Sequence, residues 1–336
     1  MQQTNHTAGS KALVTGADGL LGSHLVRELI ERGVGVRALI QPGSRSPTLD
    51  GLPIDRIEGD LLSGDEGLKN AVRGCRFAFH CAALTDMWAG PEITWKVNLE
   101  GTRSVLDACV TESVERLVWV GSASCFQFGT IDRPGDESGP FPAAYRGVPY
   151  MESKQRAMEL VREYIADKSL DAVIAVPTFL IGGHDFRPSS GELIRQFIKR
   201  GLKFASPGGR NFVYAADVAR AMVSALEKGE KGKAYILAGE NLTYLDFFAR
   251  VARFAGVEPP RRVLPRTLVL AAGAAGSLFG TITGRPAALN LRMARFSCMG
   301  TYYSPARAKR ELGMTHTPID SCIEESIRSL RGYGYI

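Results

Sequence analysis

Residues 13–22 read LVTGADGLLG, and this stretch organises the rest of the chain. The apolar run Ala12 to Val14 predicts a short strand, and the amphipathic pattern from Leu20 to Arg32 predicts a helix. A strand, a glycine-rich turn and a helix N-terminus together form an anion-binding site. The reason is that the helix presents unpaired N–H groups and the positive end of its dipole at that point.

The three glycines of the turn have separate roles in such a site. Gly16 permits a tight turn, Gly19 lets a pyrophosphate approach the backbone, and Gly22 lets the helix and strand pack closely. Their spacing, G-x-x-G-x-x-G, differs from the G-x-G-x-x-G of the general dinucleotide fingerprint. Their position between a strand and a helix still favours dinucleotide binding. The cofactor contacts expected in this stretch are Thr15, Gly16, Gly19, Leu20, Leu21 and Gly22.

Apolar runs alternate with helical patterns through the first half of the chain. Further strands are predicted at residues 34–40, 54–58, 77–81, 117–120 and 172–176. Helices are predicted at residues 92–111, 150–167, 190–200, 217–228 and 244–255. Strands separated by helices indicate a parallel sheet covered on both faces, with ligands beyond the carboxyl ends of the strands.

We therefore predict an α/β protein built on a Rossmann-type doubly wound parallel sheet. Residues 1–176 form the dinucleotide-binding domain, with a polar tail over residues 1–10. Residues 177–336 form a smaller C-terminal α/β region that binds the substrate, and some of its segments return to the sheet.

Composition excludes several classes of function. The net charge of +6 comes from basic residues spread along all 336 positions, which favours solvated helix faces over a nucleic-acid surface. The six cysteines show no C-x-x-C pair and no zinc spacing, so we expect reduced thiols and no metal. The first ten residues are polar, and no apolar run reaches the roughly 18 residues of a spanning helix. We expect a cytoplasmic protein.

Tyr150 and Lys154, in the stretch YMESK, carry the predicted chemistry. Four residues apart on a helix, they share one face. A nearby ammonium favours the phenolate, so Lys154 is expected to lower the pKa of Tyr150 and suit it to acid–base catalysis. Ser122, at the end of a predicted strand, would hold a substrate oxygen against Tyr150; Ser124 is the rival for that role.

At this point the sequence resembles the extended short-chain dehydrogenase/reductase superfamily, of the NAD-dependent epimerase/dehydratase type. The motifs that carry the resemblance run in the family's order: TGADGLLG (15–22), GDL (59–61), HCAA (80–83), VNLEGT (97–102), VGSAS (120–124), YMESK (150–154) and PTFLIGG (177–183). Within the superfamily the chain is most similar to dihydroflavonol reductase-like and 3β-hydroxysteroid dehydrogenase-like ketoreductases.

The resemblance implies a Rossmann fold that binds NAD or NADP, with Ser122, Tyr150 and Lys154 as the catalytic triad. It further implies a homodimer built on the helices predicted at residues 92–111 and 150–167. It also assigns cofactor contacts: Asp60 and Leu61 to adenine, Cys81, Ala82 and Ala83 to pyrophosphate and ribose, Asn98 to the environment of the lysine, and Pro177 and Thr178 to the nicotinamide.

The choice between NADP(H) and NAD(H) depends on the end of the second predicted strand. NAD-specific enzymes place a carboxylate there for the ribose hydroxyls, but this chain has Ile40 and no acidic residue between Gly33 and Asp50. Basic and polar residues lie close by and could meet a 2′-phosphate. We therefore favour NADP(H), with NAD(H) as the alternative. The residues concerned are Arg37, Gln41 and Arg45.

Loop residues at the predicted strand ends suggest an apolar ligand. We predict an oxidoreductase that transfers a hydride to or from a carbonyl or hydroxyl carbon of a bulky, mostly apolar ketone or alcohol. The alternative is a nucleotide-sugar epimerase or dehydratase with tightly bound NAD, which Arg210 in RNFVYAAD would suit. The candidate substrate residues are Thr85, Met87, Trp88, Ser124, Phe126, Phe179 and Arg210.

Residues 267–283, TLVLAAGAAGSLFGTIT, are uncharged and flanked by arginines. The pattern favours a buried pair of Gly/Ala-rich helices. The alternative is a hydrophobic lip through which the protein contacts a membrane surface peripherally and takes up a lipophilic substrate.

Overall fold

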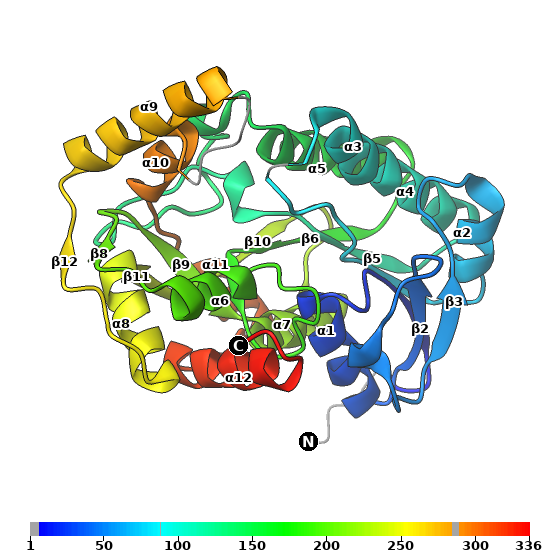
Figure 1. Cartoon of the computed structure of the whole chain (residues 1–336). Helices are drawn as coiled ribbons and strands as arrows, with labels where there is room; N and C mark the ends of the chain where they lie inside the picture. Colours follow the sequence, from blue (N-terminus) through cyan, green and yellow to red (C-terminus); the bar gives the residue numbers. More distant parts are fainter. Residues whose placement is uncertain (1–6, 88, 284–288) are drawn as a thin grey trace.

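The computed structural model describes residues 7–87, 89–283 and 289–336. Figure 1 shows a central sheet with α3, α4 and α5 on one side and α1 and α7 on the other. A smaller group of helices and short strands, which includes α6, α8, α9, α10 and α12, lies beside this sheet. The predicted α/β class is confirmed.

The central sheet is parallel throughout, with the order β10-β6-β5-β4-β1-β2-β3. From β1 the chain adds β2 and β3 on one side of the sheet and then crosses over to add β4, β5 and β6 on the other side. The strand order therefore reverses between β1 and β4. A doubly wound sheet binds its ligand at this switch point. The strands are β1 (Lys11–Thr15), β2 (Gly35–Ile40), β3 (Asp55–Glu58), β4 (Phe77–His80), β5 (Arg116–Val120), β6 (Ala172–Pro177) and β10 (Ala234–Leu237).

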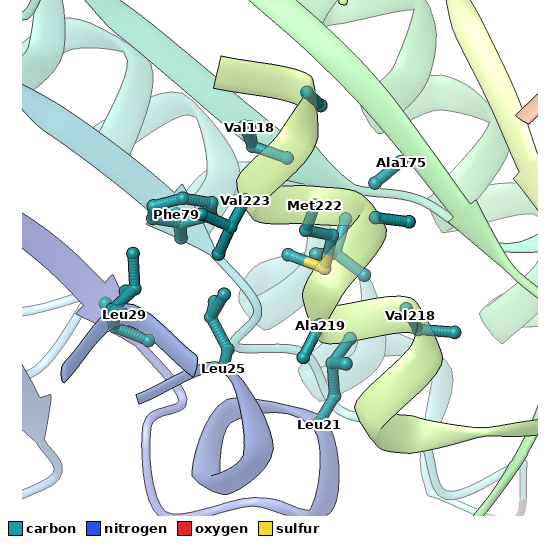
Figure 2. Close-up of a cluster of buried hydrophobic side chains, with 14 of the residues drawn as sticks. Leu21, Leu25, Leu29, Phe79, Val118, Ala175, Val218, Ala219, Met222 and Val223 are labelled. Atoms are coloured by element: carbon teal, nitrogen blue, oxygen red, sulfur yellow. The ribbon is translucent and has the colours of Figure 1, made fainter. Parts of the chain in front are cut away.

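Helices bury one apolar core on each face of the sheet. On the first face, Leu21, Leu25 and Leu29 of α1 meet α7 over the side chains of Phe79 and Val118 (Figure 2). On the second face, α2, α4 and α5 cover the core around the fully buried Trp119. The covering helices are α1 (Leu20–Glu31), α7 (Ala215–Lys228) and α11 (Ala306–Leu312), then α2 (Asp65–Val72), α4 (Gly101–Thr111) and α5 (Pro149–Asp167).

The helix predicted at residues 92–111 contains a local irregularity. Helix α3 (Pro91–Trp95) continues through a π-helical turn, Lys96–Glu100, directly into α4. Single π-helical turns inside helices occur frequently at functional sites.

The smaller region has its own core, in which Phe197, Phe212 and Phe247 are fully buried. Three segments from the C-terminal half of the chain belong to the large sheet instead: β10 pairs with β6, and α7 and α11 pack on one face. Its own elements are α6 (Gly191–Arg200), α8 (Tyr244–Ala255), α9 (Arg266–Thr283), α10 (Leu291–Ser297) and α12 (Ile319–Gly332), with β7 (Phe179–Ile181), β8 (Phe204–Ala205), β9 (Gly209–Tyr214), β11 (Glu240–Thr243), β12 (Arg262–Val263) and β13 (Gly300–Thr301).

The favoured prediction for residues 267–283, a buried helix pair, is wrong. The segment forms a single helix, α9, in which only Val269 and Gly273 are buried. Its partner is the seven-residue α10, which is too short and narrow to cover more than one side of an 18-residue helix. Within the described ranges, no helix combines the length and apolar character that crossing a bilayer requires.

Candidate active site

The glycine-rich turn and the first turn of α1 form the predicted anion site. The N-cap of α1 is Gly19, which has no side chain to bond the first N–H groups, and the first turn of α1 carries no acidic residue. A Cβ built on Gly19 would meet no atom closer than the Gly16 carbonyl oxygen at 3.4 Å, so the backbone there is open to a ligand. Leu20 and Leu21 bury their side chains and offer only first-turn N–H groups. These residues fit a dinucleotide pyrophosphate.

Gly16 and Gly22 are required by packing rather than by the ligand. Gly16 has a φ of +65°, and a Cβ there would lie 2.7 Å from the Ala82 amide nitrogen. A Cβ on Gly22 would lie 2.0 Å from the Gly16 carbonyl oxygen. Only glycine at both positions lets α1 start directly against the ends of β1 and β4.

A chain of hydrogen bonds joins the ends of β1 and β4 to the helix behind them. The Ala82 N–H donates to the Thr15 hydroxyl oxygen (3.2 Å), which lies 2.7 Å from His80 Nδ1. His80 Nε2 lies 3.2 Å from the Thr102 hydroxyl, which donates to the Asn98 carbonyl (2.7 Å). These donors and acceptors are all satisfied when neutral His80 carries its proton on Nε2.

His80 therefore positions the loop that follows β4. Burial lowers the pKa of His80 to about 3, and the nearby Lys154 acts in the same direction, so the ring stays neutral. The HCAA motif predicted roles for Cys81, Ala82 and Ala83 but none for His80. The available signal was a histidine at the end of an apolar strand, a buried position where a polar ring needs partners.

Asn98 joins the same loop to the helix that carries the catalytic pair. It lies in the π-helical turn, where its side-chain oxygen accepts from the Leu84 N–H at 2.8 Å. Its Nδ2 donates to the Leu84 carbonyl (3.1 Å) and to the Ser153 hydroxyl oxygen (3.0 Å), and that hydroxyl donates to the Tyr150 carbonyl. Asn98 is buried, so its role in this structure is to fix α5. The sequence motifs did not indicate this role for Ser153.

The other predicted cofactor residues lie along the carboxyl edge of the sheet, with one exception. Asp60 accepts from the Leu62 N–H (3.0 Å), which fixes the turn that places Leu61 beside α4. Cys81 follows β4, and burial raises the pKa of its thiol to about 12. Pro177 and Thr178 stand at the end of β6, where the Thr178 hydroxyl donates to the Asn211 side-chain oxygen at 2.6 Å.

Arg37 is the exception, and its predicted cofactor contact needs correction. It lies in the middle of β2, and its guanidinium donates to the carbonyls of Ala71 (3.0 Å) and Arg73 (2.7 Å) at the C-terminal end of α2. A helix C-terminus attracts a cation, so this end of α2 holds the side chain. Gln41 and Arg45 remain at the end of β2, both in the loop that follows it.

Ser122 and Ser124 have different roles in the structure, whereas the sequence left open which of them would hold the substrate oxygen. The Ser122 hydroxyl oxygen accepts from the Ser124 hydroxyl (2.8 Å) and N–H (3.3 Å), and so caps the short 3₁₀ helix Ala123–Cys125. With its oxygen accepting these bonds, Ser122 has its O–H left to donate, either to the neighbouring Tyr150 oxygen or to the oxygen of a ligand. Ser124 is buried and supports Ser122.

Tyr150 and Lys154 share the first turns of α5, but the expected pKa relation between them needs correction. Burial raises the pKa of Tyr150 to about 12, while its hydrogen bond with the Ser122 side chain acts in the opposite direction. Lys154 is not among the groups that shift this pKa in the structure. Its Nζ donates to the Val120 carbonyl (2.8 Å) and lies 4.9 Å from the centre of the Trp119 ring. Burial lowers the pKa of Lys154 to about 8.

A cavity of about 280 Å³ opens beside Ser122 and Tyr150. Its wall combines aromatic and aliphatic side chains with a few polar groups, the composition typical of small-molecule sites. The lining residues are Thr85, Met87, Ser122, Ala123, Ser124, Tyr145, Tyr150, Met151, Pro177, Thr178, Phe179, Leu180, Ser189, Ser190, Arg210, Asn211, Phe296, Met299, Thr301 and Tyr303.

The structure brings most of the predicted substrate residues to this cavity: Thr85, Met87, Ser124, Phe179 and Arg210 all line it. Phe126 does not, which corrects that prediction. Its side chain is buried in the core under α5, because the chain turns inward after the 3₁₀ helix. Trp88 lies outside the described residues.

Several lining residues were not predicted because they come from the C-terminal part of the chain or from long loops. The Tyr145 ring lies 5.9 Å from Phe296 of α10, centre to centre, and together they form an aromatic wall. Asn211 is buried, and its Nδ2 donates to the Gly239 carbonyl (3.2 Å) and the Asn241 side chain (2.7 Å). It therefore links the cavity wall to the turn between β10 and β11.

Arg210 is a cation in the cavity wall that has no carboxylate partner among the interactions of the described residues. Its Nε donates to the Tyr244 hydroxyl (2.7 Å), and its guanidinium lies 4.8 Å from the centre of the Phe179 ring. Aromatic faces stabilise a guanidinium but leave its charge uncompensated.

The fold and this site define a dinucleotide-binding enzyme with a serine and a tyrosine in the wall of one cavity and a buried lysine one helical turn after the tyrosine. The profile of the NAD dependent epimerase/dehydratase family matches residues 12–238. The chain belongs to this family, and it is an oxidoreductase of the extended short-chain dehydrogenase/reductase superfamily.

Among its relatives is a protein of Synechocystis sp. named for dihydroflavonol 4-reductase, 30% identical over 96% of this chain and 95% of that protein. Another is sterol demethylase protein B of Methylococcus capsulatus, 29% identical over 96% of this chain and 99% of that protein. The crystal structure of PA4631, a nucleoside-diphosphate-sugar epimerase from Pseudomonas aeruginosa, has a TM-score of 0.81 at 26% identity and covers 98% of this chain and 100% of that chain.

Substituting Gly22 and Gly19 by alanine should separate packing from cofactor binding. Gly22→Ala forces a methyl group against the Gly16 backbone, so we expect the free energy of unfolding to fall by about 1–3 kcal/mol or more. Gly19→Ala should keep its stability and bind NADPH more weakly, because its methyl group fills the space that a phosphate would approach. Thermal unfolding and fluorescence titration with NADPH measure the two effects. An equal loss of stability in both variants would contradict these roles.

Acid should destabilise the protein through its buried histidines. Burial lowers the pKa of His80 from 6.5 to about 3, so between these pH values only the unfolded chain binds the proton, and stability falls as the pH falls. At pH 5 the loss is about 2 kcal/mol for this group. Urea unfolding at pH 7 and pH 5 should show that His80→Gln reduces the pH-dependent loss by this amount. His316→Gln, at an exposed position, is the control. An unchanged loss in His80→Gln would refute the assignment.

Proposed function

We propose that this protein is an NADPH-dependent reductase of a carbonyl group on a bulky, mostly apolar molecule. The observation that carries the proposal is that Ser122 and Tyr150 line the same cavity as several aromatic side chains. A bound reduced nicotinamide supplies a hydride to the carbonyl carbon. The residues of this chain bind and orient the carbonyl oxygen and deliver its proton.

The protonation state of Tyr150 favours the reductive direction. Because burial raises the pKa of Tyr150 to about 12, its hydroxyl is protonated at neutral pH and can act as the proton donor. Ser122 would donate a second hydrogen bond to the same substrate oxygen. Lys154 would bind ribose hydroxyls and supply a positive charge when the tyrosine releases its proton.

The lining of the cavity supports an apolar substrate. Tyr145, Phe179 and Phe296 offer rings, and Met87 and Met299 offer adaptable thioether chains. The relative named sterol demethylase protein B agrees with a substrate of this kind. Arg210 adds one site for an oxygen-rich or anionic group at the edge of the substrate.

A nucleotide-sugar epimerase is the second candidate. Arg210 favours it because an arginine without a carboxylate partner suits a diphosphate, and PA4631 shares the fold under that name. The aromatic wall argues against it, because a nucleotide sugar offers little apolar surface to cover the rings. An NAD molecule that copurifies with the protein and survives dialysis would decide for the epimerase.

Tyr150→Phe should reduce turnover without loss of cofactor binding. Removing the proton donor is expected to lower kcat/KM by about 10²- to 10⁴-fold. Oxidation of NADPH with a panel of ketosteroids and long-chain ketones gives the rate, and fluorescence titration gives the affinity. Tyr164→Phe is the matched control, because this hydroxyl lies on the same helix and donates to Asp107, away from the cavity. Full activity in Tyr150→Phe would disprove the role.

We also propose that the protein prefers NADP(H), because of the residues at the end of β2. The strand ends at Ile40 without a carboxylate, and the loop after it carries Gln41 and Arg45. The Arg45 guanidinium lies 5.9 Å from the centre of the Phe186 ring. An arginine held in this loop can pair with a 2′-phosphate.

Arg45→Ala should weaken NADPH binding relative to NADH binding by about tenfold, the loss expected for one charge-assisted contact. Calorimetric titration of both dinucleotides gives the ratio of affinities. Arg37→Ala is the matched control: its side chain holds the end of α2, so it should lower stability and leave the ratio unchanged. If Arg45→Ala keeps the wild-type ratio, another group selects the cofactor.

A further inference from the structure

The apolar side chains at the surface of this protein are concentrated in one place. Of the nine large hydrophobic residues that are exposed in the described ranges, seven lie in or next to the paired strands β8 and β12 and the helix α9 that follows β12. We call this surface the apolar ridge; Figure 1 shows these elements along one outer edge of the molecule. Its residues are Leu202, Phe204, Val263, Leu268, Leu278, Phe279 and Ile282.

Helix α9 has the reverse of the pattern that a helix in water requires. Its glycine-rich side faces the protein: a Cβ on Gly273 would lie 2.4 Å from the Ala294 Cβ of α10, so the two helices touch closely. Its large side chains face outward, with Leu278, Phe279 and Ile282 exposed by 62%, 56% and 75%. Apart from the buried Val269 and the half-buried Leu270, α9 therefore turns its large apolar side chains away from the core.

The segment that contains β12, α9 and α10 carries charges of a single sign. Residues 259–300 contain six arginines and no acidic residue. Among these, Arg261 and Arg262 precede α9, Arg266 begins it, and Arg292 and Arg295 lie on α10; all five are exposed. An apolar stripe bordered by arginines complements a bilayer surface that carries anionic headgroups.

This charge distribution selects the lipid surface over a second copy of the chain. In a symmetric dimer the same surface meets itself, so apolar contact through the ridge would bring the two sets of arginines together. An anionic bilayer accepts the apolar side chains and neutralises the arginines at the same time.

Helix α10 links α9, the main element of the apolar ridge, to the wall of the substrate cavity. Helix α10 packs under α9, where the Leu291 N–H donates to the Ser277 hydroxyl oxygen at 2.9 Å. From its other side α10 contributes Phe296 to the cavity wall, and Met299 follows it. Only α10 therefore lies between α9 and the cavity that Ser122 and Tyr150 line.

We propose that β12 and α9 dock on an anionic lipid surface, and that lipophilic substrates reach the cavity from that surface past α10. The docking surface lies beyond residues 12–238, the part that the family profile matches. The route for the substrate rests on the proposed function, whereas the docking itself does not.

Flotation of the purified full chain with vesicles tests the docking. We expect it to bind phosphatidylcholine vesicles that contain phosphatidylglycerol, to bind pure phosphatidylcholine weakly, and to be released by added salt because charge contributes to binding. The triple variant Leu278→Ser, Phe279→Ser and Ile282→Ser should lose about tenfold or more in affinity. Arg261→Gln with Arg262→Gln should weaken binding only to the anionic vesicles. Ile93→Ser, an exposed apolar position on α3, is the matched control and should bind as the wild type does.

Two results would overturn the docking proposal. One is a failure in the flotation experiment: either the wild type binds neither type of vesicle, or the triple variant binds both types as strongly as the wild type does. The other is a lipid-free dimer in light scattering that the triple variant abolishes, which would make a second copy the occupant. Circular dichroism and NADPH titration verify that each variant is folded. Tyr150→Phe should bind vesicles like the wild type, so failure of the reductase proposal and failure of docking give different results.

Discussion

The contact between Gly22 and the Gly16 carbonyl is the constraint on which the rest of this structure depends. Because neither residue has a side chain, α1 starts against the ends of β1 and β4, and its first N–H groups face the switch point of the sheet. The same placement sets the apolar side of α1 against α7, which is how a helix from the second half of the chain enters the core of the first (Figure 2). The anion site and the core thus share one local cause.

A neutral polar network extends this constraint to the catalytic side chains. Thr15, His80 and Thr102 connect the sheet to the π-helical turn, and Asn98 in that turn connects to Ser153 of α5. Buried networks of this kind hold a single geometry because breaking any of their hydrogen bonds would leave a buried polar group without a partner. The position of α5, and with it of Tyr150 and Lys154, is therefore determined by residues that do not themselves react.

The substrate side is built differently, from loops and late segments. The long loop after β5 is held by the C-terminal segment, where Tyr303 donates to the Phe126 carbonyl and Gly129 and Gly135 donate to the Tyr302 carbonyl. The aromatic wall of the cavity and the helix pair α9 and α10 are positioned by this anchored loop. A cavity assembled in this way can change its lining with little effect on the sheet, which agrees with a family whose members have different substrates on one fold.

The sequence alone indicated six of the seven strands of the central sheet and the glycine turn, because these depend on local spacing, but it did not indicate β10. Ser122, Tyr150 and Lys154 were predicted as the catalytic triad from the resemblance to a family. Strand ends were predicted to within about two residues, since apolar runs end where the chain leaves the core. It did not reveal α2, a short and polar helix with Gly67 inside it. It also did not decide which way single side chains point: Phe126 turns into the core, Arg37 turns to the end of α2, and α9 turns its large residues outward. Those directions depend on partners distant in the sequence, so only the tertiary structure decided them.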